Sequence, residues 1–132
     1  MGTRCLTTVL DGETPLVTMY RQYDGHPGGH GAELVEAFGK ADIVNGIREG
    51  ARPGVTFNGA GCLAAWLVAH FKKATGGFYL HAPGIRGCGE EFHYTLTVNG
   101  SELGLKVEET NWDTGAATAT LYDGPPSDYV PA

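Results

Sequence analysis

The sequence has few charged residues, few cysteines and no long hydrophobic run. Charged residues make up 18% of the 132 residues, and the formal net charge is −6, so the chain lacks the basic field that general nucleic-acid binding requires. Its three cysteines have no C-x-x-C spacing, which indicates reduced thiols in a cytoplasmic protein. No apolar run is long enough to cross a bilayer, so we expect no membrane partner.

Several catalytic signatures are also missing. The sequence contains no Walker loop, no dinucleotide fingerprint and no nucleophile elbow. The closest pair of possible metal ligands is His26 and His30, and Pro27-Gly28-Gly29 between them disfavours a helix that would present both on one side. We therefore expect no metal and no other cofactor.

The length and composition predict one compact domain. Hydrophobic residues make up 42% of the sequence, enough for a core without disulfide or metal support. We place this domain at residues 1–124 and expect a loosely ordered, proline-containing tail at residues 125–132.

Hydrophobic periodicity predicts an α+β fold with an antiparallel sheet of about five to six strands and two helices packed on one face. The expected helices are 32–38 and 62–73, and the expected strands are 3–10, 16–23, 78–82, 91–98, the run after the Asn99-Gly100 turn, and 117–122. Segment 41–53 is expected as a loop or a short turn of helix. The second helix has apolar residues on nearly every side, which is typical of a buried helix.

The stretch 20–31 concentrates ligand-capable side chains among glycines. It carries two histidines and four glycines between a strand and the first expected helix. Backbone N–H groups at a helix start favour an anion, and a nearby guanidinium can bind phosphate or carboxylate. The residues that we expect to bind a ligand are Tyr20, Arg21, Tyr23, His26, Gly28, Gly29, His30 and Gly31, together with Arg86 from a later glycine-rich loop.

These residues predict a pocket for a small anionic ligand. Arg21, His30 and the Gly28–Gly31 backbone would hold a phosphate group. Two simpler explanations stay open. The glycines can form an ordinary turn, and Arg21 can pair with an internal carboxylate such as Asp24 or Glu33.

A second hypothesis is a metal-independent phosphodiesterase. The run His93-Tyr94-Thr95 matches the His-x-Thr motif of two-histidine phosphoesterases once, whereas His81-Ala82-Pro83 lacks the hydroxyl of a second copy. If the fold brought His30 and His93 together, they could act as acid and base. A third hypothesis is a protein-interaction module that uses the sheet face with Glu91, His93, Thr95 and Thr97.

The longest motif supports a family resemblance. The pattern Tyr20-Arg21-Gln22-Tyr23-Asp24-Gly25-x-Pro27-x-Gly29-His30-Gly31, with Asn58-Gly59-x-Gly61-Cys62 and Leu121-Tyr122-Asp123-Gly124-Pro125, resembles a family of small single-domain proteins from bacteria and their phages. The resemblance implies a phage counter-defence protein that sequesters or cleaves a cyclic nucleotide immune signal in the host cytoplasm, with a homo-oligomer expected. For such a nucleotide, Tyr20 or Tyr23 would stack on the base. The family commonly has tyrosine where this chain has His26, so in an enzyme the resemblance favours His30 over His26 as a catalytic residue.

Overall fold

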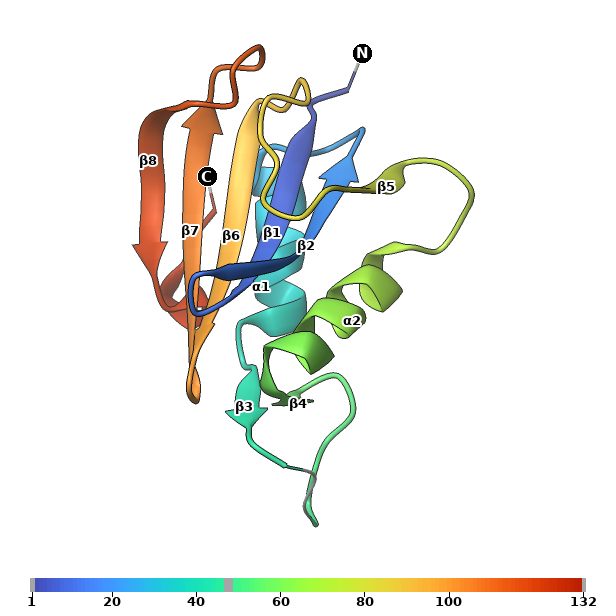
Figure 1. Ribbon diagram of the computed structural model, residues 1–132, viewed down its shortest axis with the longest axis vertical. Helices are drawn as coiled ribbons and strands as arrows, with labels where there is room; N and C mark the ends of the chain where they lie inside the picture. The colour runs from blue at the N-terminus through green and yellow to red at the C-terminus, as the bar shows by residue number, and fades with distance from the viewer. Residues whose placement is uncertain (1, 47–48, 132) are drawn as a thin grey trace.

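The computed structural model describes residues 2–46 and 49–131 and has the α+β fold that the sequence predicts (Figure 1). Six strands form one mixed, mostly antiparallel sheet in the order β5-β2-β1-β6-β7-β8, and β3 and β4 form a small parallel pair. The strands are β1 (Cys5–Asp11), β2 (Thr14–Arg21), β3 (Asp42–Val44), β4 (Thr56–Asn58), β5 (Phe78–His81), β6 (Phe92–Asn99), β7 (Glu102–Thr110) and β8 (Ala117–Gly124). The helical segments are η1 (Pro27–Gly31), α1 (Ala32–Phe38), α2 (Gly59–Phe71) and η2 (Pro126–Asp128).

One strand pair departs from the expected antiparallel sheet. Strand β6 runs parallel to β1, whereas the other neighbours in the large sheet are antiparallel. The reason is the connection after β5, which is antiparallel to β2 and therefore runs in the direction of β1. Residues 82–91 cross from this edge strand past β2 and β1, so β6 starts at the same end of the sheet as β1. Residues 42–44, expected in a loop or a turn of helix, instead form β3 beside β4.

The two faces of the large sheet differ, as the alternation in β6 predicts. Tyr94, Leu96 and Val98 belong to the hydrophobic core, which the helices cover. From α2, Leu63 and Leu67 are fully buried in the same core. Burying each such side chain contributes about 1.5–3 kcal/mol, so this layer provides most of the stabilisation. The helices cover only this face, and the opposite face of the sheet is open.

Helix α2 is not buried on all sides, contrary to the sequence expectation. Ala65, Trp66 and Ala69 face outward, and Trp66 is 38% exposed. The helix has no second layer on its outer side, and small side chains there cost little to expose. Neither α1 nor α2 is long and apolar enough to cross a membrane.

The C-terminal segment packs onto the domain in place of the loosely ordered tail that the sequence suggested. The short helix η2 places Tyr129 in the core, where its ring lies 4.8 Å from that of Tyr122. Tyr129 is only 7% exposed, and it also lies against the Gly31 backbone. One buried aromatic side chain thus fixes a proline-containing segment that has little periodicity of its own.

Candidate functional site

Arg21 points into the helix-covered side of the sheet and is saturated by internal partners. Its guanidinium forms an ion pair with Glu33 of α1, and its Nε donates a 2.6 Å hydrogen bond to the Tyr23 carbonyl. The guanidinium also lies 5.0 Å from the centre of the Phe78 ring. Arg21 is 9% exposed, so it pairs with an internal carboxylate, one of the two alternatives left open by the sequence.

His30 is completely buried beside Arg21. Arg21 Nη1 lies 3.1 Å from His30 Nδ1, and His30 Nε2 lies 2.6 Å from the Thr7 hydroxyl. Because arginine can only donate, Nδ1 accepts and Nε2–H donates to Thr7. Burial and the positive charge of Arg21 lower the pKa of His30 to about 3, so the ring is neutral near pH 7.

The glycines next to His30 fit the packing of the fold. A Cβ at Gly29 would meet the Asp24 carbonyl oxygen at 2.5 Å, and one at Gly31 would meet the Tyr129 ring at 3.3 Å. His30 N–H donates to the Asp24 carbonyl, and Gly29 N–H lies 3.1 Å from His26 Nδ1, which caps η1. These backbone donors are therefore already used within the turn.

The remaining residues of the motif are spread over different surfaces. Tyr20 alternates with Arg21 on β2 and lies on the opposite side of the sheet, 8% exposed, with its hydroxyl donating to Gln22. Tyr23 is 58% exposed. Gly28 lies within η1, away from the open face that Tyr20 adjoins. The structure does not gather these side chains into one cavity.

His30 and His93 lie on opposite faces of the sheet. His30 bonds to Thr7 and His93 bonds to Thr8, and these consecutive residues of β1 point to opposite sides. The sheet therefore separates the two imidazoles, and they do not share one substrate position. This placement removes the geometric basis of the proposed acid–base pair.

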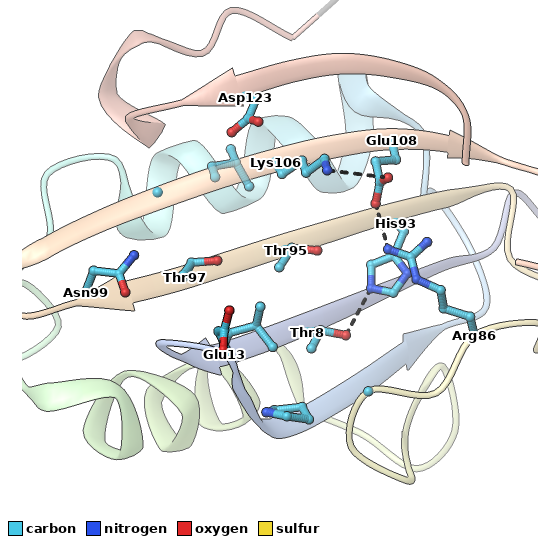
Figure 2. A pocket seen from close by; sticks show the side chains of 15 residues that line it. Thr8, Glu13, Arg86, His93, Thr95, Thr97, Asn99, Lys106, Glu108 and Asp123 are labelled. Atoms are coloured by element: carbon cyan, nitrogen blue, oxygen red, sulfur yellow. Dashed lines mark hydrogen bonds and ion pairs between the residues drawn. The ribbon is translucent and has the colours of Figure 1, made fainter. Parts of the chain in front are cut away.

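The open face of the sheet carries a pocket of about 610 Å³ (Figure 2). Its floor is formed by polar residues of β1, β6 and β7, and its walls by the β1–β2 hairpin, the loop before β6 and the end of β8. The lining residues are Thr8, Leu10, Glu13, Pro15, Gly84, Arg86, His93, Thr95, Thr97, Asn99, Gly104, Leu105, Lys106, Glu108 and Asp123.

The polar side chains of this pocket have a clear order. Figure 2 shows Thr95 and Thr97 following His93 along β6, with Arg86 at the His93 end. The same view shows Glu13 and Asp123 on either side of this row. The pocket thus offers a cation at one end and carboxylates along its sides.

Gly104 keeps the floor of the pocket low. It lies opposite Thr97 in the β6–β7 pairing, and a Cβ built there meets only the Thr97 carbonyl oxygen, at 4.0 Å. Its backbone is not left-handed, so neither conformation nor packing requires glycine here. A glycine inside a strand is intrinsically unfavourable and is typical of a place where a ligand approaches closely.

Arg86 is the residue of the predicted ligand set that lines the pocket. Its guanidinium donates to Glu108 at 2.8 Å and to the Gly115 carbonyl at 3.0 Å, and its side chain is 39% exposed. The loop that carries it is fixed by the fully buried Glu90, whose carboxylate accepts the Gly87 and Cys88 N–H groups. Arg86 is therefore held in place yet keeps a face toward the pocket.

His93 forms the buried end of the pocket and is 2% exposed. Its Nε2 lies 3.0 Å from the Thr8 hydroxyl, which in turn lies 2.9 Å from the Thr18 hydroxyl. Burial, reinforced by the positive charge of Arg86 and opposed by Glu108, lowers the pKa of His93 to about 4. The neutral ring has one saturated nitrogen, and among the described side chains its Nδ1 is the buried polar atom without a hydrogen-bond partner.

Residues 2–46 and 49–131 contain no cluster of three His, Cys, Asp or Glu side chains that could hold a metal ion. The chain matches no protein-family model, no curated protein and no solved structure with which it was compared. What the pocket can bind is therefore inferred from its geometry alone.

Sequence reasoning missed most of the pocket residues. It assigned His93, Thr95 and Thr97 to an open sheet face but did not extend that face to the neighbouring strands. The alternation of Leu103, Leu105 and Val107 places the intervening residues on the same side as His93. This alternation was the signal that could have found Gly104, Lys106 and Glu108.

Proposed function

We propose that the protein captures a small polar ligand in the open-face pocket and does not convert it, and that phosphate-bearing nucleotides are its ligand class. The observation that supports this most is the polar hollow kept open by Gly104, with the Arg86 guanidinium at one end. A volume of about 610 Å³ lies in the range of ligand pockets, which is roughly 300–1,000 Å³.

The charges of the pocket restrict the ligand further. Two cations, Arg86 and Lys106, face three carboxylates, Glu13, Glu108 and Asp123. Glu108 partly neutralises both cations, since its carboxylate lies 2.8 Å from Arg86 and 3.9 Å from Lys106. The arrangement favours a ligand with a small anionic group at the Arg86 end and hydrogen-bond donors, such as an amino base and ribose hydroxyls, between Glu13 and Asp123.

Capture fits the pocket better than cleavage. A general base must accept a proton near neutral pH, but the burial that lowers the pKa of His93 to about 4 makes its ring a poor proton acceptor. Glu108 is held by Arg86, and His30 lies beyond the sheet. A sequestering protein needs only hydrogen bonds and shape, both of which this pocket supplies. In a phage-encoded counter-defence protein, such capture would remove a cyclic nucleotide immune signal from the host cytoplasm.

The test is a binding assay with a panel of cyclic mono-, di- and trinucleotides, followed by chromatography of each mixture before and after heat denaturation. Depletion that heating reverses, with the same molecule recovered, is the expected result. A new product peak would contradict capture. If no compound is depleted, the open face is better explained as a protein-interaction surface.

A matched pair of arginine variants sharpens this assay. Arg86→Gln removes the charge at the end of the pocket, and we expect affinity for the depleted nucleotide to fall about tenfold or more, as for a charge-assisted hydrogen bond worth roughly 1.5–3 kcal/mol. Arg52→Gln is the control, since Arg52 is exposed and does not line the pocket. Equal affinities of the two variants would contradict the assignment of Arg86.

A further inference from the structure

A hydrogen-bond relay connects the loop before β6 to His93. The Gly84 N–H donates to the Thr18 hydroxyl at 2.9 Å, the Thr18 and Thr8 hydroxyls are 2.9 Å apart, and the Thr8 hydroxyl lies 3.0 Å from His93 Nε2. Thr18 is fully buried, and Thr8 and His93 are 3% and 2% exposed, so bulk water does not compete along the relay. Each hydroxyl has one hydrogen to donate.

The direction of this relay follows from its first donor. Gly84 N–H can only donate, so the Thr18 oxygen accepts there and its hydrogen is free for Thr8. The Thr8 hydrogen is then free for His93 Nε2. If Thr8 instead donated to Thr18, the Thr18 hydroxyl hydrogen would have no acceptor among the described residues. A buried hydroxyl without an acceptor is costly. The relay therefore makes Nε2 an acceptor and places the ring proton on Nδ1.

Nδ1–H is then a buried donor without an acceptor. A buried polar group without a partner costs about 1–3 kcal/mol and calls for an explanation such as a ligand or an ordered water. His93 lines the pocket with Arg86, whose charge acts on its ring. A donor and a guanidinium at the same end of a pocket together suit an oxyanion.

We propose that His93 Nδ1–H binds an acceptor oxygen of the ligand, with the phosphate held between His93 and Arg86. This inference rests on the proposed function, because it names the atom that selects the ligand in the same pocket. Since Nδ1 is closed to solvent, the acceptor enters with a shift of residues 82–85, which precede the part of the loop that Glu90 fixes and include Gly84 with its left-handed backbone. That shift acts on the Gly84 end of the relay, so ligand entry and the hydrogen bonding of His93 are linked.

The test is a two-bond ¹H–¹⁵N correlation spectrum of the histidine rings at pH 7, with inorganic phosphate as the probe and chloride of equal ionic strength as the control. The signals that vanish in His93→Gln belong to His93. We expect the Nδ1–H tautomer in the free protein and a saturable change of the His93 Nδ1 shift with phosphate but not with chloride. An Nε2–H tautomer would overturn the relay, and an Nδ1–H that does not respond to phosphate would mean that water satisfies it.

Two threonine variants provide a second measurement. Thr8→Val removes the hydroxyl that fixes Nε2, so we expect a mixture of tautomers and a phosphate response weakened about tenfold. Thr120→Val is the control, because Thr120 is exposed on β8 and neither lines the pocket nor joins the relay. Equal phosphate responses of the two variants would overturn the role of the relay. These results do not depend on the nucleotide panel, so a failure of the proposed nucleotide ligand and a failure of the His93 assignment can be told apart.

Discussion

The two buried histidines of this protein have similar surroundings on opposite faces of the sheet. Each ring is bonded through Nε2 to a threonine of β1, His30 to Thr7 on the helix-covered face and His93 to Thr8 on the open face. His30 Nδ1 accepts from Arg21, whereas His93 Nδ1 has no partner among the described residues. The two rings therefore differ in whether Nδ1 has a hydrogen-bond partner. Both nitrogens of His30 are bonded within the fold, whereas the Nδ1 of His93 can still form a hydrogen bond.

The same contrast applies to the two arginines of the expected ligand set. Arg21 is inside the domain, with Glu33, Tyr23 and two aromatic rings around it. Arg86 is anchored by Glu108 but keeps 39% of its side chain exposed beside a hollow. The residues of the glycine-rich motif therefore stabilise the packing of the domain. The candidate site lies on the other face of the sheet.

The largest effect is expected from Arg21→Ala. The change leaves the buried His30 Nδ1 without its donor and removes the partly exposed ion pair with Glu33, so the free energy of unfolding should fall by about 2–3 kcal/mol, mainly because of the unpaired ring. Urea denaturation measures this loss. A variant that keeps its stability but loses ligand binding would show that Arg21 binds the ligand, and the binding site would then lie at the glycine-rich motif.

A pH effect of intermediate size follows from the two rings. Burial on folding lowers the pKa from 6.5 to about 3 for His30 and to about 4 for His93. Below pH 6.5 the unfolded chain therefore binds more protons than the folded one. The stabilisation is complete above pH 6.5 and falls as the pH decreases toward 4, by about 1.4 kcal/mol per pH unit for each ring.

Urea unfolding at several pH values tests this linkage. His30→Asn should reduce the slope between pH 6 and pH 5 by about 1.4 kcal/mol per pH unit, whatever it does to stability at pH 7. The exposed Thr120 provides the control, since Thr120→Val removes no ionisable group and should leave the slope unchanged. A slope unchanged by His30→Asn would contradict the buried neutral ring.

Gly104→Val should affect binding without harming the fold. The new side chain enters the pocket, where the nearest atom to its Cβ is 4.0 Å away, and valine suits a strand better than glycine. We expect the free energy of unfolding to stay the same or rise by up to about 1 kcal/mol, while nucleotide binding is lost. Thermal unfolding and a titration measure the two quantities. Retained binding would mean that the ligand does not use this floor.

The smallest effect is expected from His26→Ala. The ring caps the Gly29 N–H from an exposed position, so its removal should cost about 0.5–1 kcal/mol and leave ligand affinity unchanged. Urea denaturation and the same titration provide the measurement. A large loss of affinity would place a ligand at the turn after all.

The sequence predicted the elements of the fold well because their patterns are local. Both helices and all six strands of the large sheet lie within a few residues of their expected positions, and the face assignment in β6 is confirmed. The parallel β1–β6 pair could not be predicted, since it depends on where the chain returns after residue 91. Strand β3 has only three residues, too few for a periodic signal.

The candidate site was harder to predict because the type of a residue does not reveal whether its hydrogen-bonding groups are already paired within the protein. Arg21 and His30 have the chemistry of ligand groups. The sequence allowed Glu33 as a partner of Arg21, but only the fold shows that Glu33 and Thr7 bind the two side chains. Arg86 was found from its glycine-rich loop. Its neighbours Lys106 and Glu108 lie on the polar face of β7, which only the alternation of that strand indicates.

We propose that the open face, rather than the glycine-rich turn, binds the ligand. The most direct test is a backbone amide chemical-shift titration of the assigned protein with the nucleotide that the panel depletes most. We expect saturable shifts at Thr95, Thr97 and Gly104, with little change at Gly29 and His30. Shifts concentrated at Gly29 and His30, with the open face silent, would contradict it.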